Sequence, residues 1–162
     1  MKTVKFGGSS LASAEQVRKV CDIVAADPAR RLVVVSAPGK RDSGDTKVTD
    51  LLIATAEARL TNRDGKTELA RVVDRFSDIA VGLGMSEESM EPIRSDLQQR
   101  LAADTGDEGL YLDTMKAAGE ANAARLVAAY LRDQGIDAHC IDPAEAGMIL
   151  SDEPGNARVL RQ

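Results

Sequence analysis

The sequence predicts a three-layer α/β/α sandwich built on a mostly parallel β-sheet. Two short apolar runs, at 3–6 and 31–36, have the length of buried strands, and the segment between them has helical spacing. A long helical region then leads to a further expected strand at 136–141. Strands that alternate with helices are typical of parallel sheets with helices on both faces. With 162 residues, 43% of them hydrophobic, the chain can form one domain with its own core.

The segment between the first two strands predicts an amphipathic helix. Ser13 can cap its N-terminus, and Gln16 follows three residues later in a capping-box pattern. Its apolar residues then recur at helical spacing and form one stripe: Val17, Val20, Cys21 and Val24.

A loop and a second helix follow the second strand. Residues 38–46 (PGKRDSGDT) are rich in glycine and charge, which predicts an irregular and solvated segment. Thr49 or Asp50 is expected to cap the next helix, which contains the apolar residues 51–53.

The second half of the chain is predominantly helical in pattern. Residues 66–104 predict two amphipathic helices separated by the Gly-Leu-Gly sequence at 82–84. A long helix is predicted over 110–134, interrupted at Gly119 and ended by Gly135. After the expected strand at 136–141, residues 143–148 indicate a helical turn and 149–150 a further strand element.

Composition narrows the functional classes. The formal net charge of −5 argues against nucleic acid as the main partner, because a phosphate backbone selects a basic surface. The N-terminus has no signal-peptide pattern, and no run approaches the roughly 20 apolar residues of a membrane span, so we expect a cytoplasmic protein. Cys21 and Cys140 lie in apolar contexts without metal-ligand spacing, and we expect both to be reduced core residues.

The stretch KFGGSSL at 5–11 is the first candidate site. Lys5 ends a strand, which places a cation at the edge where α/β sheets bind ligands. Gly7 and Gly8 let the backbone approach an anion, and their N–H groups, with those of Ser9 and Ser10, can form a nest for phosphate oxygens. The stretch is neither a Walker loop nor a GxGxxG motif. The alternative is a simple strand-to-helix turn with a surface lysine.

Three other positions are candidates, each with a structural alternative. Ser36 follows the second strand at the same expected edge, but serine is also common in turns. Thr49 lies near a helix N-terminus that favours anions, but it can equally serve as a cap. Gly119 within a helix suggests close approach by another segment, and Glu120 beside it faces either a site or solvent. His139 has no catalytic or metal partners and is interpreted as structural.

Together these stretches resemble one family. KFGGSSLAS, VVVSAPGKR, KVTDLL and the later Gly-Glu pair, in this order, resemble the N-terminal half of the aspartate kinases, which belong to the amino acid kinase family. The resemblance extends over 5–147. It implies an amino acid kinase fold and ATP-dependent phosphorylation of the side-chain carboxylate of L-aspartate, giving 4-phospho-L-aspartate. That is the first step toward lysine, threonine, methionine and, in many bacteria, diaminopimelate.

The resemblance also implies roles for residues. Lys5 would contact the transferred phosphoryl group as the catalytic residue, and the stretch Lys5, Phe6, Gly7, Gly8 and Ser9 would hold the phosphates of ATP, with Mg²⁺ carried by the nucleotide. Ser36 and Thr49 would lie around the aspartate, and Glu120 would hold its amino group. No residue is expected to ligate a metal directly. Such roles suit phosphoryl transfer to a carboxylate, which needs charge neutralisation but no general base.

Two alanines depart from the family pattern. Ala117 and Ala123 stand where the family usually has hydrogen-bonding residues, three positions before and after the glutamate, while Asn122 stands one place early. We therefore expect fewer hydrogen bonds around Glu120.

The resemblance implies that 1–162 form the N-terminal part of a longer kinase domain, with a helical insert at about 61–106. The family's later half supplies an RGGSD-like substrate segment and most of the adenine site, and regulatory ACT domains usually follow. We expect a truncated chain that does not turn over alone, and a homo-oligomer for the full-length protein.

Two alternatives stay open. The chain can belong to another member of the family, acting on glutamate, acetylglutamate or carbamate. It can also belong to a non-catalytic module that binds an anion or assembles with a partner through the same half-sheet.

Overall fold

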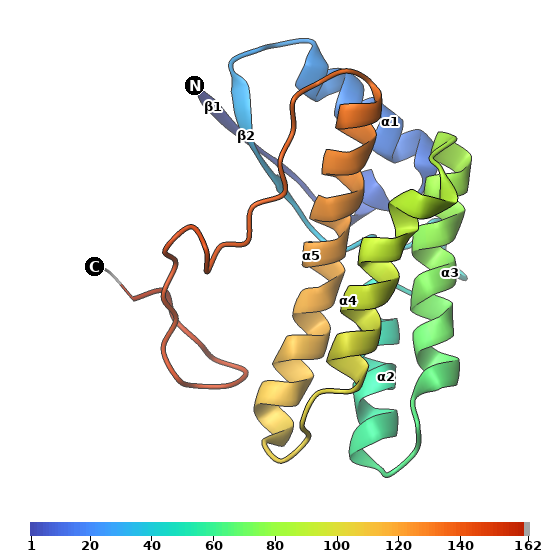
Figure 1. The fold of residues 1–162 in the computed structure, drawn as a ribbon, viewed down its shortest axis with the longest axis vertical. Coiled ribbons are helices and arrows are strands. Elements are labelled where there is room, and N and C mark those ends of the chain that lie inside the picture. Colours follow the sequence, from blue (N-terminus) through green and yellow to red (C-terminus); the bar gives the residue numbers. More distant parts are fainter. Residues whose placement is uncertain (161–162) are drawn as a thin grey trace.

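The computed structural model describes residues 1–160, which form a two-stranded parallel sheet and five α-helices (Figure 1). In chain order, the elements are β1 (Lys2–Phe6), the 3₁₀ turn η1 (Gly8–Leu11), α1 (Ala14–Ala25), β2 (Arg30–Val35), α2 (Val48–Leu60), α3 (Lys66–Leu83), the 3₁₀ turn η2 (Glu87–Met90), α4 (Glu91–Leu101) and α5 (Glu108–Asp133).

The two strands end at the same edge of the sheet. β1 pairs with β2 in parallel, with Phe6 opposite Val35, and α1 makes the crossover between them. The predicted cap of α1 is confirmed, because the hydroxyl of Ser13 accepts a hydrogen bond from the Gln16 N–H. The loops that follow the two strands therefore start side by side, where parallel sheets bind ligands.

Helices cover one face of the sheet. Val33 and Val35 pack against the helical core, and α1 and α5 both contact β2. Leu32 and Val34 alternate to the opposite face, where they are 43% and 47% exposed. The predicted mixed α/β class and parallel sheet are confirmed, and residues 1–160 supply the helical layer of one face.

The helices α2, α3, α4 and α5 lie side by side as a long bundle (Figure 1). Its core is largely aliphatic and includes the fully buried side chains Leu52, Val72, Phe76, Leu97 and Met115. The range predicted as a helical insert contains α3, η2 and α4; its status as an insert stays a prediction.

Three local features of the helices and loops differ from the prediction. Lys47, rather than Thr49 or Asp50, is the N-cap of α2, and no side chain caps that helix; both predicted caps lie within its first turn. α5 runs through Gly119 without interruption, because packing stabilises a helix there despite the low propensity of glycine. The predicted loop after β1 contains the turn η1.

The predicted stops at glycine are correct. Gly84 ends α3 and Gly135 follows α5, both with a positive φ that favours glycine.

The predicted strand at 136–141 is wrong. Its first N–H, from Ile136, still bonds to Leu131 O at the end of α5, and the rest of the segment pairs with no strand among residues 1–160. Apolar alternation favours a strand only where a neighbouring strand offers its backbone groups. Hydrogen bonds within 142–148 form the predicted turn.

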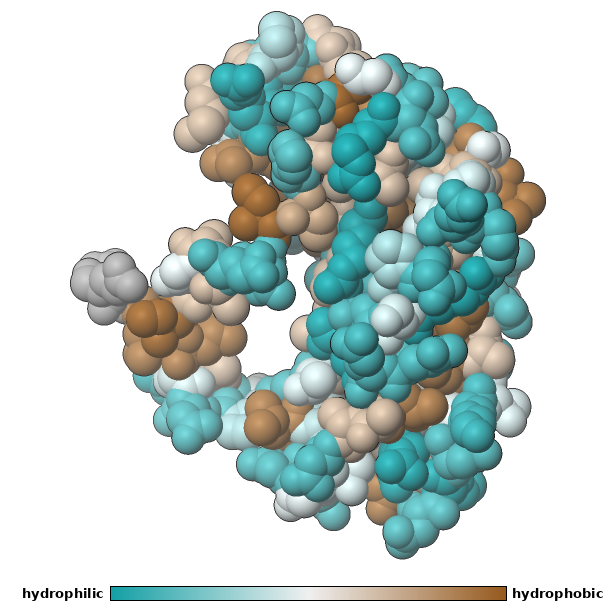
Figure 2. All heavy atoms as spheres, viewed as in Figure 1, coloured by the Kyte–Doolittle hydropathy of each residue, from teal (hydrophilic) through white to brown (hydrophobic). Residues whose placement is uncertain are grey.

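The chain from 141 to 160 leaves the C-terminal end of α5 as an arm and returns to the first turns of the same helix, where the Gly155 N–H donates to Asp113 Oδ2 (Figure 1). An isolated antiparallel bridge pairs Leu150 with Val159, in agreement with a further strand element near 149–150. The apolar side chains of this arm are exposed and gather at one side of the molecule (Figure 2). They are Ile141, Met148, Ile149, Leu150, Val159 and Leu160.

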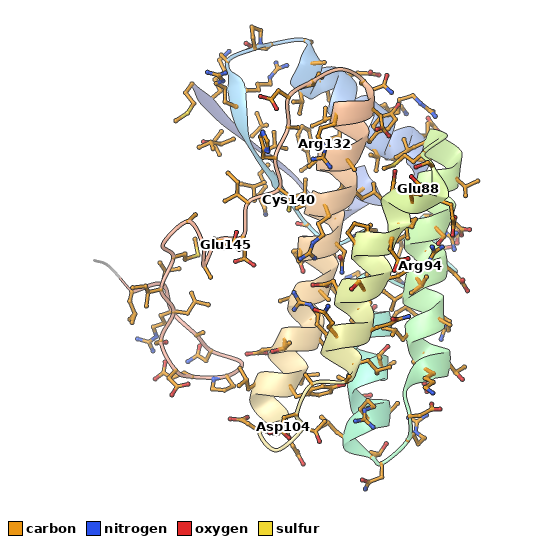
Figure 3. All side chains as sticks on the ribbon, in the orientation of Figure 1. Glu88, Arg94, Asp104, Arg132, Cys140 and Glu145 are labelled. Atoms are coloured by element: carbon orange, nitrogen blue, oxygen red, sulfur yellow. The ribbon has the colours of Figure 1, made fainter. Side chains whose placement is uncertain are left out.

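The two cysteines differ in burial. Cys21 is buried in α1, as predicted, and burial raises the pKa of its thiol to about 11. The prediction that Cys140 is a core residue is wrong: it is exposed and lies on the segment after α5 (Figure 3). The adjacent His139 is also exposed and lies 3.0 Å from Asp137.

None of the helices within residues 1–160 combines the length and hydrophobicity needed to span a membrane.

Phe76 tests the packing of the bundle. Its ring is fully buried on α3, so we expect Phe76→Ala to lower the free energy of unfolding by about 3–5 kcal/mol. Val81 on the same helix is 73% exposed, and Val81→Ala should change that free energy by less than about 0.5 kcal/mol. Chemical denaturation of both variants measures the difference, and equal effects would contradict the observed core.

Candidate functional site

The loops after β1 and β2 touch through their backbones. We call residues 7–12 the glycine loop and residues 36–47 the β2 loop. The Gly39 N–H donates to Gly8 O at 2.8 Å. A Cβ at Gly8 would lie 2.9 Å from Ala37 O, and a Cβ at Gly39 would lie 2.8 Å from Gly8 C. Because only glycine fits at either position, this crossing requires both residues.

The glycine loop offers donors and a cation. Lys5 is exposed, and its side chain makes no ion pair or hydrogen bond with any residue among 1–160. Gly8 and Ser9 open the turn η1, so their N–H groups have no partner within that turn. Gly7 precedes the turn in an extended conformation and is exposed. Such a cluster is suited to phosphate oxygens.

Strand alternation separates Lys5 from its neighbour Phe6. Phe6 packs against the helical core, whereas Lys5 lies opposite Val34 on the open face of the sheet. Phe6 therefore reaches the site through its backbone, and its carbonyl accepts the Ser36 N–H at 3.1 Å.

The β2 loop places Ser36 and Thr49 at its two ends. Ser36 directly follows β2 and is half-buried. At the other end, the Val48 N–H donates to Pro38 O at 3.1 Å, which brings the N-terminus of α2 against the loop. Thr49 lies in the first turn of α2 and is half-buried.

Helix α5 meets the β2 loop at Gly119 and Glu120. The Ala37 N–H donates to Glu120 Oε1 at 3.2 Å. A Cβ at Gly119 would lie 2.6 Å from the Cβ of Ala37, so α5 approaches the loop as closely as the missing side chain allows. The close approach predicted from a mid-helix glycine is confirmed. Glu120, though exposed, is held at the edge where β2 ends.

Asn122 does not support Glu120. It is fully buried, and its side-chain amide donates to Asp96 Oδ2 on α4 at 2.8 Å. Its oxygen accepts a hydrogen bond from Arg125 at 2.9 Å. Ala123 is buried and Ala117 is exposed. The hydrogen bond to Glu120 comes instead from the β2 loop.

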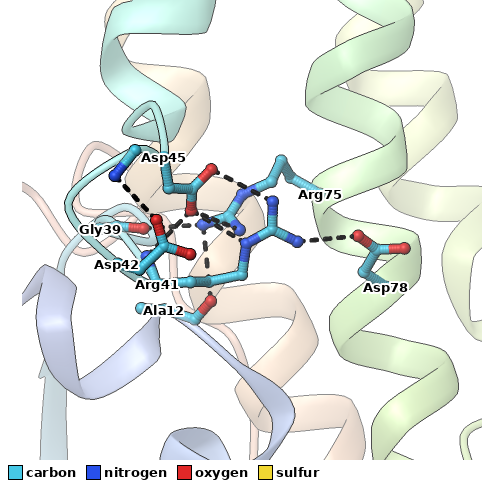
Figure 4. A network of polar contacts seen from close by, with 8 residues as sticks. Ala12, Gly39, Arg41, Asp42, Asp45, Arg75 and Asp78 are labelled. Carbon is cyan, nitrogen blue, oxygen red and sulfur yellow. Dashed lines mark hydrogen bonds and ion pairs between the residues drawn. The ribbon is translucent and has the colours of Figure 1, made fainter.

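A charged network that the sequence did not predict lies beside this site. Arg75 of α3 is 5% exposed and bonds to Gly39 O at 2.7 Å, and its Nη1 lies 3.0 Å from Asp45 Oδ2 (Figure 4). A signal was present, because Arg75 falls at helical spacing within the apolar face formed by Val72, Phe76 and Ile79. A charge in that stripe indicates a paired, buried group.

Asp45 closes the β2 loop on itself. Its carboxylate accepts hydrogen bonds from the Arg41 side chain, with Nε at 2.9 Å, and from the Arg41 backbone N–H at 2.9 Å. These bonds hold the pKa of Asp45 far below its ordinary value, the Arg41 side chain contributing most and Arg75 less.

Within residues 1–160, no three His, Cys, Asp or Glu side chains gather to hold a metal ion.

The chain matches the model of the amino acid kinase family over residues 1–162. Aspartokinase 3 of Bacillus subtilis is 51% identical over 160 residues, which cover 99% of this chain and 35% of the Bacillus protein. The chain thus spans about a third of the length of this curated relative.

Two solved structures share the fold. E. coli aspartokinase III in complex with lysine and aspartate has a TM-score of 0.72 at 25% identity, covering 97% of this chain and 34% of the other. Clostridium acetobutylicum aspartate kinase has a TM-score of 0.67 at 28% identity, covering 80% and 29%. The chain belongs to the amino acid kinase family, and the resemblance to aspartate kinases is confirmed.

Gly119 tests the contact between α5 and the β2 loop. Alanine has the better helix propensity by about 1 kcal/mol, but the new methyl group collides with Ala37. We expect Gly119→Ala to lower the free energy of unfolding by about 1–3 kcal/mol, as other overpacked sites do. Adding Ala37→Gly removes the opposing methyl group and should recover part of the loss. Calorimetry on the single and double variants measures both, and a stabilising single variant would contradict the contact.

The decrease of the free energy of unfolding at acidic pH tests the role of Asp45. Its pKa in the folded protein lies below the ordinary 3.8, so its contribution is full above about pH 4 and is lost as the pH falls through the folded pKa. We expect Asp45→Asn to be less stable than wild type at pH 7 and to lose less stability between pH 4 and pH 2. Asp74→Asn is the control, since this exposed aspartate of α3 has no ion pair among residues 1–160. An equal loss of the free energy of unfolding between pH 4 and pH 2 in wild type and Asp45→Asn would refute the expectation.

Proposed function

We propose that the protein containing this chain is an aspartate kinase, which uses ATP to phosphorylate the side-chain carboxylate of L-aspartate. The observation that carries the proposal is the convergence of the glycine loop, the β2 loop and α5 on residues 37–39, at the end of the sheet where Lys5 lies with no ion pair among residues 1–160. The 51% identity to Aspartokinase 3 of B. subtilis supports this substrate over other acids.

The proposed reaction is a direct transfer. An oxygen of the aspartate carboxylate attacks the γ-phosphorus of ATP, the bond to the β–γ bridging oxygen breaks, and ADP leaves. The carboxylate is already ionised at neutral pH, so no residue has to accept a proton. The protein contributes by positioning the reactants and by stabilising charge on the phosphoryl oxygens.

We propose one role for each candidate residue. Lys5 stabilises the charge on the transferred phosphoryl group, and the N–H groups of Gly7, Gly8 and Ser9 hold phosphate oxygens. The Phe6 carbonyl keeps the start of the β2 loop in register. Ser36 and Thr49 contact the aspartate, and Glu120 receives its ammonium group.

Magnesium is proposed to arrive with the nucleotide, where it would offset phosphate charge during transfer. The groups that could bind a magnesium–nucleotide complex here are the N–H groups of the glycine loop and the Lys5 ammonium group. Both are hydrogen-bond donors, so they suit the phosphate oxygens rather than the metal itself.

We further propose a cytoplasmic, homo-oligomeric enzyme at the first step toward lysine, threonine and methionine. Residues 1–162 are proposed as the N-terminal part of the kinase domain, with 61–106 as a helical insert. This part alone is proposed to be inactive, because it spans 35% of the Bacillus relative.

Lys5 tests the proposed function. Trapping aspartyl phosphate with hydroxylamine in the complete protein should show ATP-dependent product. We expect Lys5→Met to lower kcat on the order of 10²–10³-fold, as for other groups that stabilise charge in the transition state. Lys2→Met is the matched control at the other end of β1, since Lys2 pairs with Asp27 at the surface and should leave the rate unchanged.

A substrate panel separates the alternatives. Product with glutamate, acetylglutamate or carbamate, but not with aspartate, would assign another member of the family. No phosphoryl transfer to any of them would favour a binding or assembly module.

A further inference from the structure

Arg75 is buried beside the candidate site without belonging to the proposed ligand contacts. It projects from the middle of α3, and 5% of its surface is exposed. Burying a guanidinium is costly unless its charge and donors are satisfied. Among residues 1–160, Arg75 Nε and Nη1 make no hydrogen bond, so the buried charge depends on the bonds of Nη2 and on the ion pair with Asp45.

The groups that contact Arg75 in this way come from both loops of the site. Arg75 Nη2 donates to Gly39 O of the β2 loop at 2.7 Å and lies 3.5 Å from Ala12 O of the glycine loop. Arg75 Nη1 pairs with the carboxylate of Asp45, farther along the β2 loop (Figure 4). One side chain thus contacts the glycine loop and two separate points of the β2 loop.

A second arginine reinforces the same arrangement from the surface. Arg41 holds Asp45 and also reaches Asp78 on α3 at 3.1 Å. Arg41 is 43% exposed at its side chain, whereas Arg75 is 6% exposed. Screening by water makes the exposed pair weak, so Arg75 carries the greater part of the attachment to α3.

Gly39 transmits this attachment to the glycine loop. Its carbonyl accepts from Arg75, and its N–H donates to Gly8 O at 2.8 Å. A shift of Gly39 would therefore move the amide groups proposed to hold phosphate relative to Ser36 and Thr49, which are proposed to contact aspartate.

We propose that Arg75 is a positioning residue for phosphoryl transfer: acting through Gly39 and Asp45, it sets the spacing between the glycine loop and the β2 loop. The proposal rests on the proposed function. Lysine cannot replace it, because a single ammonium group does not reproduce the planar fork that reaches a carbonyl and a carboxylate together. Displacements near 1 Å between reacting groups can cost about 10²-fold in rate.

The test compares Arg75→Lys, Arg75→Met and the control Arg71→Met in the complete protein. Arg71 is exposed on the same helix one turn earlier, and its side chain makes no hydrogen bond or ion pair among residues 1–160. We expect Arg75→Lys to lower kcat on the order of 10–100-fold, with little change in the KM for ATP or the KM for aspartate. We expect Arg71→Met to match wild type.

Hydrogen exchange of the ligand-free protein gives an independent readout. In Arg75→Lys, exchange should accelerate at the amides of Gly39 and its neighbours in the β2 loop, while the amides of α4 and α5 stay protected. This pattern, together with the fall in kcat and a preserved Tm, supports positioning. Wild-type kcat in Arg75→Lys, or uniformly faster exchange with a lowered Tm, would overturn the proposal.

The outcomes also separate the two proposals. A wild-type protein that forms no aspartyl phosphate refutes the proposed function, and the positioning role falls with it. A wild-type protein that is active, with Arg75→Lys and Arg75→Met equally active, refutes the positioning role alone.

Discussion

The backbone contact between Gly8 and Gly39 is the constraint on which the candidate site depends. A parallel pair of strands brings two loops to one edge, but it does not make them touch. Here the loops cross at a hydrogen bond of 2.8 Å, with no room for a Cβ on either glycine. The amides of one loop are thereby fixed relative to the polar groups of the other. The phosphoryl transfer proposed for this site would require that fixed relation, because the rate of such a transfer depends on the alignment of its two reactants.

The helical bundle holds this crossing from two sides. α5 touches the β2 loop through Gly119 and Glu120, and α3 reaches it through Arg75. Leu11, Pro38, Phe76 and Ala123 line a common small void, so both loops pack into the same core as both helices. The long helices therefore do more than cover the sheet, since their packing determines where the loops lie.

Sequence alone predicted what depends on local pattern. Ser13 caps α1 because its partner lies three residues away, and Gly119 marks a close approach because its cost within a helix needs a reason. The strand predicted at 136–141 failed because pairing depends on a distant partner that alternation cannot reveal. The prediction that Cys140 is a core residue was also wrong, because an apolar sequence context does not ensure burial. The Arg75 network joins residues up to 63 positions apart, and only the tertiary fold brings them together.

The arginines and the lysines near the site have different roles: within the described part of the chain, the arginines are ion-paired, and the lysines are not. Arg41 and Arg75 are matched by Asp45 and Asp78, so these groups together add little net charge. Their planar guanidinium groups instead define directions and distances within the loops. The lysines Lys5, Lys40 and Lys47 form no ion pair among residues 1–160 and keep their charge available. An acidic chain can thus attract an anion locally, because its arginines set the geometry while unpaired lysines provide the field.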